Sequence, residues 1–349
     1  MSTLDAKAAA SEGATGEPMK YKTVPAMPDL AFSAVGFGCW GISGGSTWNG
    51  STDEESIRTV RTAVDLGITY FDVAPVYGFG HAEEVLGEAL ARRRDSVLIG
   101  SKCGLLWDDS GAIRNDLSSA SIGKEIDESL HRLNTDHLDL YQMHWPDIAT
   151  PIEESMEALE RVVAAGKVRY IGVTNFSVER TDACRAIGPV AAHQGLYNML
   201  EHNPTSYHEI PLEYRTRSEI LPMVMREGMA FFPYSPLFQG LLTDAFSRTG
   251  NFDENDVRAA NPKLNGEAFD AYYEAAQRLR RLAGELGRPL NQFAINWLAS
   301  QAAVTSVIAG GQTPEHVTAN AAAVTWDVTA EVFDRVDGIL APYAERGLI

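Results

Sequence analysis

Short apolar segments alternate with longer amphipathic segments along most of this chain, and this alternation limits the available folds more than any other feature. The short segments are rich in β-branched and aromatic residues and are apolar at odd and even positions alike. Parallel strands covered on both faces have this composition. They lie at 34–37, 69–73, 97–102, 138–144, 168–173, 190–194, 229–234 and 305–309.

Helical segments lie between these strands. Thr52 or Asp53 can cap a helix that ends near Leu66, before Gly67. Eight strand–helix alternations predict an α/β chain folded as a single-domain (β/α)8 TIM barrel, with a doubly wound open sheet as the alternative. Further helices are expected at about 82–92, 118–133, 151–165, 178–186, 215–226, 266–287, 290–301, 314–323 and 329–340.

Two segments fall outside this alternation. Residues 1–20 are rich in Ala, Ser, Gly and Glu, which predicts a short flexible, disordered N-terminal extension because such a segment buries little apolar surface. The barrel is expected over 21–349. An irregular stretch at about 238–266 follows the seventh strand, so we expect a lid loop on the face where barrel active sites form.

The charge balance excludes several classes of partner. The 349 residues include 29 Lys and Arg against 47 Asp and Glu, a formal net charge of −18. This argues against binding to nucleic acid or to anionic lipid. No apolar run approaches the roughly 18 residues of a membrane span, and the N-terminus lacks the apolar core of a signal peptide, which predicts a cytoplasmic protein. The three cysteines show neither a disulfide framework nor zinc-site spacing.

Four titratable residues lie at or just after the ends of consecutive predicted strands. Asp72 closes the second strand and Tyr77 follows it. Lys102 closes the third strand, and His144 closes the fourth. The C-terminal ends of the strands form the catalytic face of a TIM barrel. We therefore expect these four side chains to converge on one site.

The chemistry of these groups suits protonation of a carbonyl oxygen. A phenol is protonated at neutral pH, and a neighbouring ammonium would ease loss of its proton. A carboxylate can pair with a buried ammonium, and a neutral imidazole can orient a carbonyl oxygen through a hydrogen bond. None of these groups can donate hydride, so a cofactor is required.

Other interpretations stay open at this level. Lys102 could form a Schiff base, as in a barrel aldolase. His144 and His193 could bind a metal ion in a hydrolase. No His-x-His pattern or carboxylate cluster accompanies these histidines, so no metal site is expected.

Over about 21–341 the chain resembles the aldo-keto reductase superfamily. The resemblance rests on motifs that occur in order at the predicted strand ends, which makes it more specific than any one motif. It implies a TIM-barrel oxidoreductase, an aldo-keto reductase or alcohol dehydrogenase, that uses NAD(P)(H) to interconvert an aldehyde or ketone and an alcohol by hydride transfer. The motifs are 36-GFGCWGISG-44, 70-YFDVAPVYGFGHAEEVLG-87, 140-LYQMHWPD-147, 166-GKVRYIGVTNFS-177, 194-QGLYN-198, 232-FPYSPLFQGLLT-243 and 307-VIAGGQTPEHVTANAAA-323.

The resemblance also implies roles for individual residues. Tyr77 matches the general acid/base, and His144 matches the histidine that orients the carbonyl. Lys102 and Asp72 match the pair that tunes the tyrosine. The residues that match the cofactor site are Thr174, Asn175 and Gln194 at the nicotinamide carboxamide, Tyr234 against the nicotinamide ring, Ser235, Pro236, Leu237, Gln239 and Gly240 around the pyrophosphate, and Gly311, Gln312, His316 and Asn320 at the adenosine end.

One departure from the family pattern concerns the cofactor. Many relatives have Arg where this chain has Gln312, and a guanidinium recognises phosphate through a planar, permanently charged fork. NADP(H), the family default, is slightly favoured, and NAD(H) is the alternative. His316 could still contact a 2′-phosphate.

The remaining expectations concern substrate and partners. Trp40 and Trp145 follow the first and fourth strands and are expected to form an apolar wall around a small-molecule carbonyl or alcohol substrate. The protein is expected to be a monomer or a small homo-oligomer. A nicotinamide-binding regulatory subunit, like the channel-associated members of the family, is the alternative to an enzyme.

Overall fold

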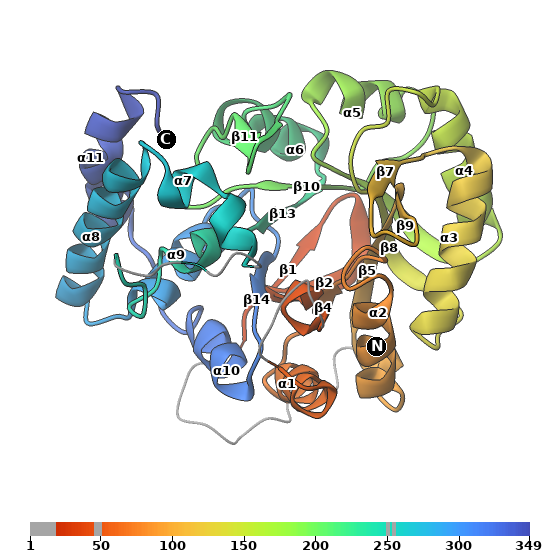
Figure 1. Cartoon of the computed structure of the whole chain (residues 1–349), viewed down its shortest axis with the longest axis horizontal. Coiled ribbons are helices and arrows are strands. Elements are labelled where there is room, and N and C mark those ends of the chain that lie inside the picture. The colour runs from red at the N-terminus through yellow and green to blue at the C-terminus, as the bar shows by residue number, and fades with distance from the viewer. Residues whose placement is uncertain (1–18, 45–50, 249–251, 253–255) are drawn as a thin grey trace.

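Eight short parallel strands form one sheet at the centre of the molecule (Figure 1). The computed structural model describes residues 19–44, 51–248, 252 and 256–349. The backbone N–H of Thr305, just before the last strand, donates to the carbonyl of Phe231 (2.9 Å), so the sheet is nearly closed. The predicted (β/α)8 TIM barrel is thus confirmed. In order around the sheet, its strands are β14 (Val307–Gly310), β3 (Val35–Gly38), β4 (Tyr70–Asp72), β5 (Leu98–Cys103), β8 (Leu138–Met143), β9 (Val168–Thr174), β10 (Ala192–Leu196) and β13 (Ala230–Tyr234).

Large apolar side chains fill the barrel below its C-terminal rim. Tyr70, Leu140 and Phe232, from three strands, belong to one buried cluster. Tyr70 needs a small neighbour, since a Cβ on Gly100 would lie 2.4 Å from the tyrosine hydroxyl. The interior is therefore a packed core, and the chemistry is confined to the strand ends.

An N-terminal hairpin closes the floor of the barrel. Strands β1 (Tyr21–Val24) and β2 (Met27–Ser33) pair antiparallel. Met27 and Phe32 pack into the interior cluster. This hairpin was not predicted, because prolines interrupt its apolar pattern and its burial depends on strands that are distant in the chain.

The predicted flexible extension differs from the structure at its last residues. Lys20 Nζ pairs with Asp327 Oδ1 (2.6 Å), and the Lys20 carbonyl accepts from the N–H of Ala34 (2.8 Å). Lys20 therefore belongs to the folded part of the chain. The rest of the predicted extension, 1–18, lies outside the described residues.

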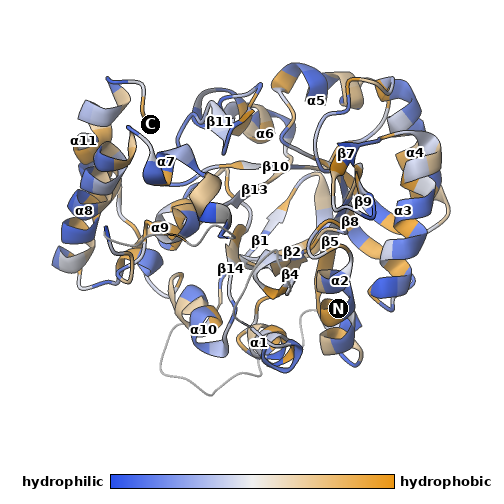
Figure 2. Ribbon diagram, in the orientation of Figure 1, coloured by the Kyte–Doolittle hydropathy of each residue, from blue (hydrophilic) through white to orange (hydrophobic). Residues whose placement is uncertain are grey.

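Helices surround the barrel (Figure 1). Thr52 caps the first of them through its side chain, as predicted, and Ser118 and Ser177 cap two others. Helices α3 and α4 carry both hydrophilic and hydrophobic residues (Figure 2), as expected when one face of a helix covers a sheet. The helices are α1 (Asp53–Asp65), α2 (His81–Leu90), α3 (Ser119–Arg132), α4 (Ile152–Ala164), α5 (Val178–Arg185), α6 (Leu221–Glu227), α8 (Phe269–Glu285), α9 (Leu290–Ala299), α10 (Pro314–Ala322) and α11 (Ala330–Ala344).

The helix predicted at 215–226 is irregular in its first half. Thr216–Ile220 is a π-helical turn, and α6 begins only at Leu221. Pro222 lies in the first turn of α6 and has no N–H, so regular hydrogen bonds cannot run through it. Other helix ends differ from the predictions by up to four residues.

The predicted lid segment contains short helical turns, at Phe238–Gly240, Val257–Ala260 and in α7 (Pro262–Asn265). Lys263 Nζ donates to Glu201 Oε1 (2.6 Å) and to the Ser206 carbonyl (2.9 Å), which ties the segment to a small hairpin, β11 (Ser206–Tyr207) and β12 (Ile210–Pro211). Parts of it, 249–251 and 253–255, lie outside the described residues, and its role as a lid stays a prediction. Within the described ranges, no helix has the length and apolar character needed to cross a membrane.

Candidate active site

The four predicted catalytic residues, called the tetrad below, meet at the C-terminal rim of the barrel. Asp72 is the last residue of β4, and Lys102 is the last but one of β5. His144 directly follows β8. These three strands are neighbours in the sheet, which brings side chains far apart in the chain into one place.

The ammonium of Lys102 is the centre of the tetrad. Lys102 is fully buried, and its Nζ donates to Asp72 Oδ2 (2.8 Å), to the Val73 carbonyl (3.1 Å) and to Tyr77 Oη (3.1 Å). An ammonium has three hydrogens and no acceptor, so these bonds use all of its donors. The Tyr77 oxygen therefore accepts from Lys102, and its own hydrogen can be given to another group.

The Tyr77 ring lies near two other rings. Its centroid lies 5.2 Å from that of Trp40 and 6.0 Å from that of His144. Burial, followed by the Asp72 carboxylate, raises the pKa of Tyr77 well above its ordinary value. The proximity of Lys102 predicts a shift toward the phenolate, but the pKa of Tyr77 shifts in the opposite direction. Tyr77 is thus a protonated phenol at neutral pH.

His144 is a neutral imidazole beside this phenol. Burial, followed by the charge of Lys102, lowers the pKa of His144 well below its ordinary value. Its backbone N–H donates to the Cys103 carbonyl (3.0 Å), and its carbonyl accepts from Asn175 Nδ2 (3.3 Å). The backbone of His144 is therefore held from both neighbouring strands.

The side chains predicted at the carboxamide lie next to the tetrad. Gln194 Nε2 donates to Asp72 Oδ1 (2.8 Å), so the Gln194 oxygen faces away from the carboxylate and is an acceptor. Thr174 Oγ1 is buried, and no described residue hydrogen-bonds to it. A buried hydroxyl in this position calls for a polar partner. A carboxamide, which both donates and accepts, fits this pair of groups.

Asn175 and Tyr234 are joined to each other. Asn175 Oδ1 accepts from the hydroxyl of Tyr234 (2.8 Å) and from that of Tyr214 (3.0 Å). Tyr214 was not predicted as a site residue, because it stands alone in 212-LEYR-215 with no motif around it. Only the tertiary structure brings its hydroxyl to the end of β9.

The stretch predicted at the pyrophosphate has an unusual backbone. Ser235, Phe238 and Gln239 have φ of +54°, +46° and +52°, and Gly240 has φ of +100°. This left-handed conformation strains residues other than glycine, and such strain clusters at ligand sites. Successive backbone N–H groups in such a turn can also face an anion. Pro236 and Leu237 lie within the same turn.

The residues predicted at the adenosine end surround the N-terminus of α10, after Gly311. The Gln312 N–H donates to His316 Nδ1 (3.4 Å), and the Gln312 carbonyl accepts from the Thr59 hydroxyl (3.2 Å). Asn320 Nδ2 donates to the Gly310 carbonyl (3.0 Å). A helix N-terminus favours phosphate groups. β9, β10 and β13 are neighbours in the sheet, and β14 approaches β13 through the bond from Thr305 to Phe231, so the predicted cofactor residues lie at or after the ends of four successive strands.

The two predicted substrate residues, Trp40 and Trp145, differ in how they lie relative to the tetrad. Trp40 contacts the Tyr77 ring directly. Trp145 follows His144 and is partly buried against the core. Contact with a substrate stays a prediction for both. His193, an alternative metal ligand, instead shares a hydrogen bond with the Phe176 carbonyl (2.9 Å), and no group of three or more His, Cys, Asp or Glu in the described ranges could hold a metal ion.

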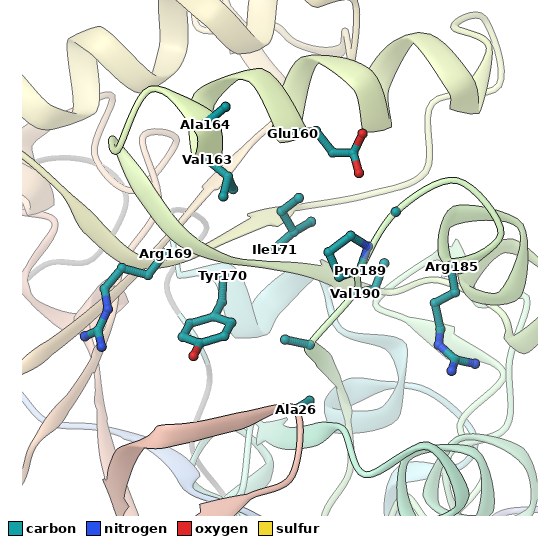
Figure 3. Close-up of a pocket in the computed structure, with 12 residues that line it drawn as sticks. Ala26, Glu160, Val163, Ala164, Arg169, Tyr170, Ile171, Arg185, Pro189 and Val190 are labelled. Atoms are coloured by element: carbon teal, nitrogen blue, oxygen red, sulfur yellow. The ribbon is translucent and has the colours of Figure 1, made fainter.

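A groove of about 590 Å³ lies on another part of the surface (Figure 3). It is bordered by α4, by the first residues of β9 and by Ala26 in the hairpin that closes the floor. Its guanidinium groups are already paired, Arg169 with Asp139 and Arg185 with Glu227. No tetrad residue lines it, so it is not the catalytic site.

Comparisons with known proteins agree with the fold. A model of the aldo/keto reductase family matches residues 34–341. The chain is 34% identical to the aldo-keto reductase YhdN of Bacillus subtilis (strain 168), over 92% of this chain and 94% of that protein. It is 30% identical to the NADH-specific methylglyoxal reductase of Escherichia coli (strain K12), over 85% of this chain and 91% of that protein. Its structure is similar to that of the glycerol dehydrogenase AKR11B4 from Gluconobacter oxydans, with a TM-score of 0.82 and 34% identity over 92% of this chain and 95% of that chain.

Proposed function

The chain belongs to the aldo/keto reductase family and is an oxidoreductase that acts on carbonyl and alcohol groups, and we propose that Tyr77 is its general acid and base. The cofactor is a nicotinamide dinucleotide held along the rim from Thr174 to Asn320. When bound, this cofactor supplies the hydride that the side chains of the tetrad cannot supply.

One observation carries the proposal: Lys102 Nζ bonds to Asp72 Oδ2 and to Tyr77 Oη at the same time. The bond from Lys102 occupies the phenol oxygen and directs the phenol hydrogen elsewhere. In reduction, the Tyr77 O–H bond breaks, and its proton goes to the carbonyl oxygen as the carbonyl carbon receives hydride. In the reverse direction, the phenolate form of Tyr77 takes the proton from the alcohol and becomes the phenol again.

Two other groups place the substrate and the cofactor. The neutral His144 donates a hydrogen bond from its protonated ring nitrogen to the carbonyl oxygen, beside the phenol. Gln194 and Thr174 hold the carboxamide and so determine which face of the nicotinamide meets the substrate. The relatives named for glycerol and for methylglyoxal support small oxygenated carbonyl compounds as the first substrates to assay.

Replacing Tyr77 with phenylalanine tests the proposal. Tyr77→Phe keeps the ring packed on Trp40 but removes the proton, so turnover should fall by about 10²–10⁴-fold while cofactor affinity stays within about twofold. Tyr141→Phe is a matched control, because Tyr141 is also buried but lies within β8 and is not part of the tetrad. Turnover of Tyr77→Phe within about twofold of the parent would remove the role. An inactive parent that still binds the cofactor would favour the regulatory subunit.

The cofactor preference is a separate question, and we propose that it depends on Gln312. A thermal-shift comparison of NAD⁺ with NADP⁺ measures it, because a ligand stabilises the fold by RT ln(1 + [L]/Kd). Gln312→Arg should enlarge the shift with NADP⁺ relative to the shift with NAD⁺, since arginine adds a charged fork for the 2′-phosphate. An unchanged ratio of the two thermal shifts would mean that residues other than Gln312 determine the cofactor preference.

A further inference from the structure

The hydroxyl of Tyr214 is bonded on two sides at the C-terminal rim. Tyr214 is fully buried. Its hydroxyl accepts from the backbone N–H of Leu196 (3.1 Å) and donates to Asn175 Oδ1 (3.0 Å). A backbone N–H can only donate, so the single hydroxyl hydrogen remains for a side-chain acceptor, and Asn175 Oδ1 lies at hydrogen-bond distance. The direction of both bonds is thereby determined.

The Asn175 amide is in turn held in one orientation. Its Nδ2 donates to the His144 carbonyl (3.3 Å), and that carbonyl can only accept. Its Oδ1 accepts from Tyr214 and from Tyr234, which uses both lone pairs of the oxygen. A flipped amide would put two oxygens face to face at His144. Asn175 has φ of +63°, a conformation that asparagine tolerates better than most residues.

These bonds join the ends of four neighbouring strands. His144 follows β8, Asn175 follows β9, Leu196 ends β10 and Tyr234 ends β13, and these strands are adjacent in the sheet. We propose that Tyr214 is a positioning residue for the reaction: its hydroxyl orients the Asn175 amide and, through it, sets the places of His144 and Tyr234. Tyr214 thus links His144, which orients the carbonyl, to Tyr234, which is predicted to lie against the nicotinamide ring.

The inference rests on the proposed function, in which His144 and Tyr234 flank the reacting atoms. Without the hydroxyl, Asn175 Oδ1 keeps only the bond from Tyr234 and the Leu196 N–H loses its acceptor, so the amide is held less firmly in its orientation. A displacement of about 1 Å at a reacting group can cost about 10²-fold in rate. We therefore expect Tyr214→Phe to lower kcat by about 10–100-fold and to weaken cofactor binding by about 10-fold.

Tyr197→Phe is the matched control for this experiment. Tyr197 is also fully buried, and its hydroxyl donates to Gln301 Oε1 (2.9 Å), away from the tetrad. Each substitution removes one tyrosine hydroxyl, and the thermal midpoint should fall further for Tyr214→Phe, because that variant also leaves the Leu196 N–H without its acceptor. Only Tyr214→Phe should change kcat, the KM of a small aldehyde and the Kd of the reduced cofactor measured by fluorescence.

The outcomes distinguish the positioning role of Tyr214 from the proposed function of the protein. Kinetic constants of Tyr214→Phe within about twofold of the parent, or equal losses in both variants, would overturn the positioning role. A parent with no turnover would instead contradict the proposed function, and the cofactor Kd of Tyr214→Phe would then still test the link to Asn175.

A measurement on the unsubstituted protein covers the case in which Tyr214→Phe does not fold. With tyrosine labelled with ¹³C at Cζ, the Tyr214 signal should shift when the cofactor binds, and the Tyr197 signal should not. A Tyr214 signal that does not respond to the cofactor would overturn the inference.

Discussion

Replacing Glu125 with glutamine should change how the stability of this protein depends on pH. Glu125 lies in α3 and is 3% exposed. Its carboxylate accepts from the backbone N–H of Gly104 (3.0 and 3.1 Å) and from the hydroxyl of Ser121 (2.9 Å). No ion pair to Glu125 is found within the described ranges of the chain. Burial is the main cause that raises the pKa of Glu125 from 4.5 to about 7.

The direction of the effect follows from this raised pKa. Between about pH 4.5 and pH 7 the folded protein holds a proton on Glu125 that the unfolded chain has lost, so stability falls as the pH rises through this interval. Below about pH 4.5, the contribution of the protonated Glu125 carboxyl to the free energy of unfolding is fully present. A rise in pKa from 4.5 to about 7 corresponds to about 3 kcal/mol. Glutamine can still accept from Gly104 and donate to Ser121, but it has no charge to bury.

Urea unfolding followed by tryptophan fluorescence measures this contribution. The free energy of unfolding of Glu125→Gln, relative to the parent, should rise by about 3 kcal/mol between about pH 4.5 and pH 8. Glu128→Gln is the control, because the Glu128 side chain is 46% exposed on the same helix and should show no comparable rise. A difference between Glu125→Gln and the parent that stays constant with pH would refute the reasoning.

Two further predictions concern the tetrad and the turn that carries it. Lys102→Met should destabilise the fold by about 3–5 kcal/mol, because it leaves the buried Asp72 without a cation, and Lys102→Met with Asp72→Asn should recover much of this loss in urea unfolding without recovering turnover. A double variant no more stable than Lys102→Met would contradict this. Gly78→Ala should lower both stability and turnover, because Gly78 has φ of +65° and its Cβ would lie 2.2 Å from the Ser43 carbonyl oxygen. Gly166→Ala, at φ of +76° in open space, should cost only about 1 kcal/mol and keep full turnover, and equal losses in the two variants would show that the contact with Ser43 is unimportant.

The rim of the barrel shows why part of the site was predictable. A parallel strand buried on both faces must be short and apolar, and its C-terminal end lies on one side of the sheet. The order of the segments therefore placed Asp72, Lys102 and His144 on the same rim before any distance was known. Their hydrogen bonds then depend only on neighbouring strands, as with Lys102 and Asp72.

Other features could not be predicted in this way. The hairpin of β1 and β2 is stable because Met27 and Phe32 fill the barrel floor against Tyr70 and Phe232, which no local pattern reveals. The elevated pKa of Tyr77 has a similar origin, since its main cause is burial, which depends on the surrounding packing.

The sequence by itself therefore determined the barrel, the rim that carries the reactive groups and the four side chains that meet there, because periodicity and strand order are local properties of the chain. Only the tertiary structure decided the orientation of those groups: that the Tyr77 oxygen accepts from Lys102 and leaves its one hydrogen available, that the Gln194 oxygen faces away from Asp72, and that Tyr214 reaches Asn175. The direction of a hydrogen bond depends on all the partners of the two atoms that form it. These partners come from segments far apart in the chain, and the sequence does not reveal that those segments meet.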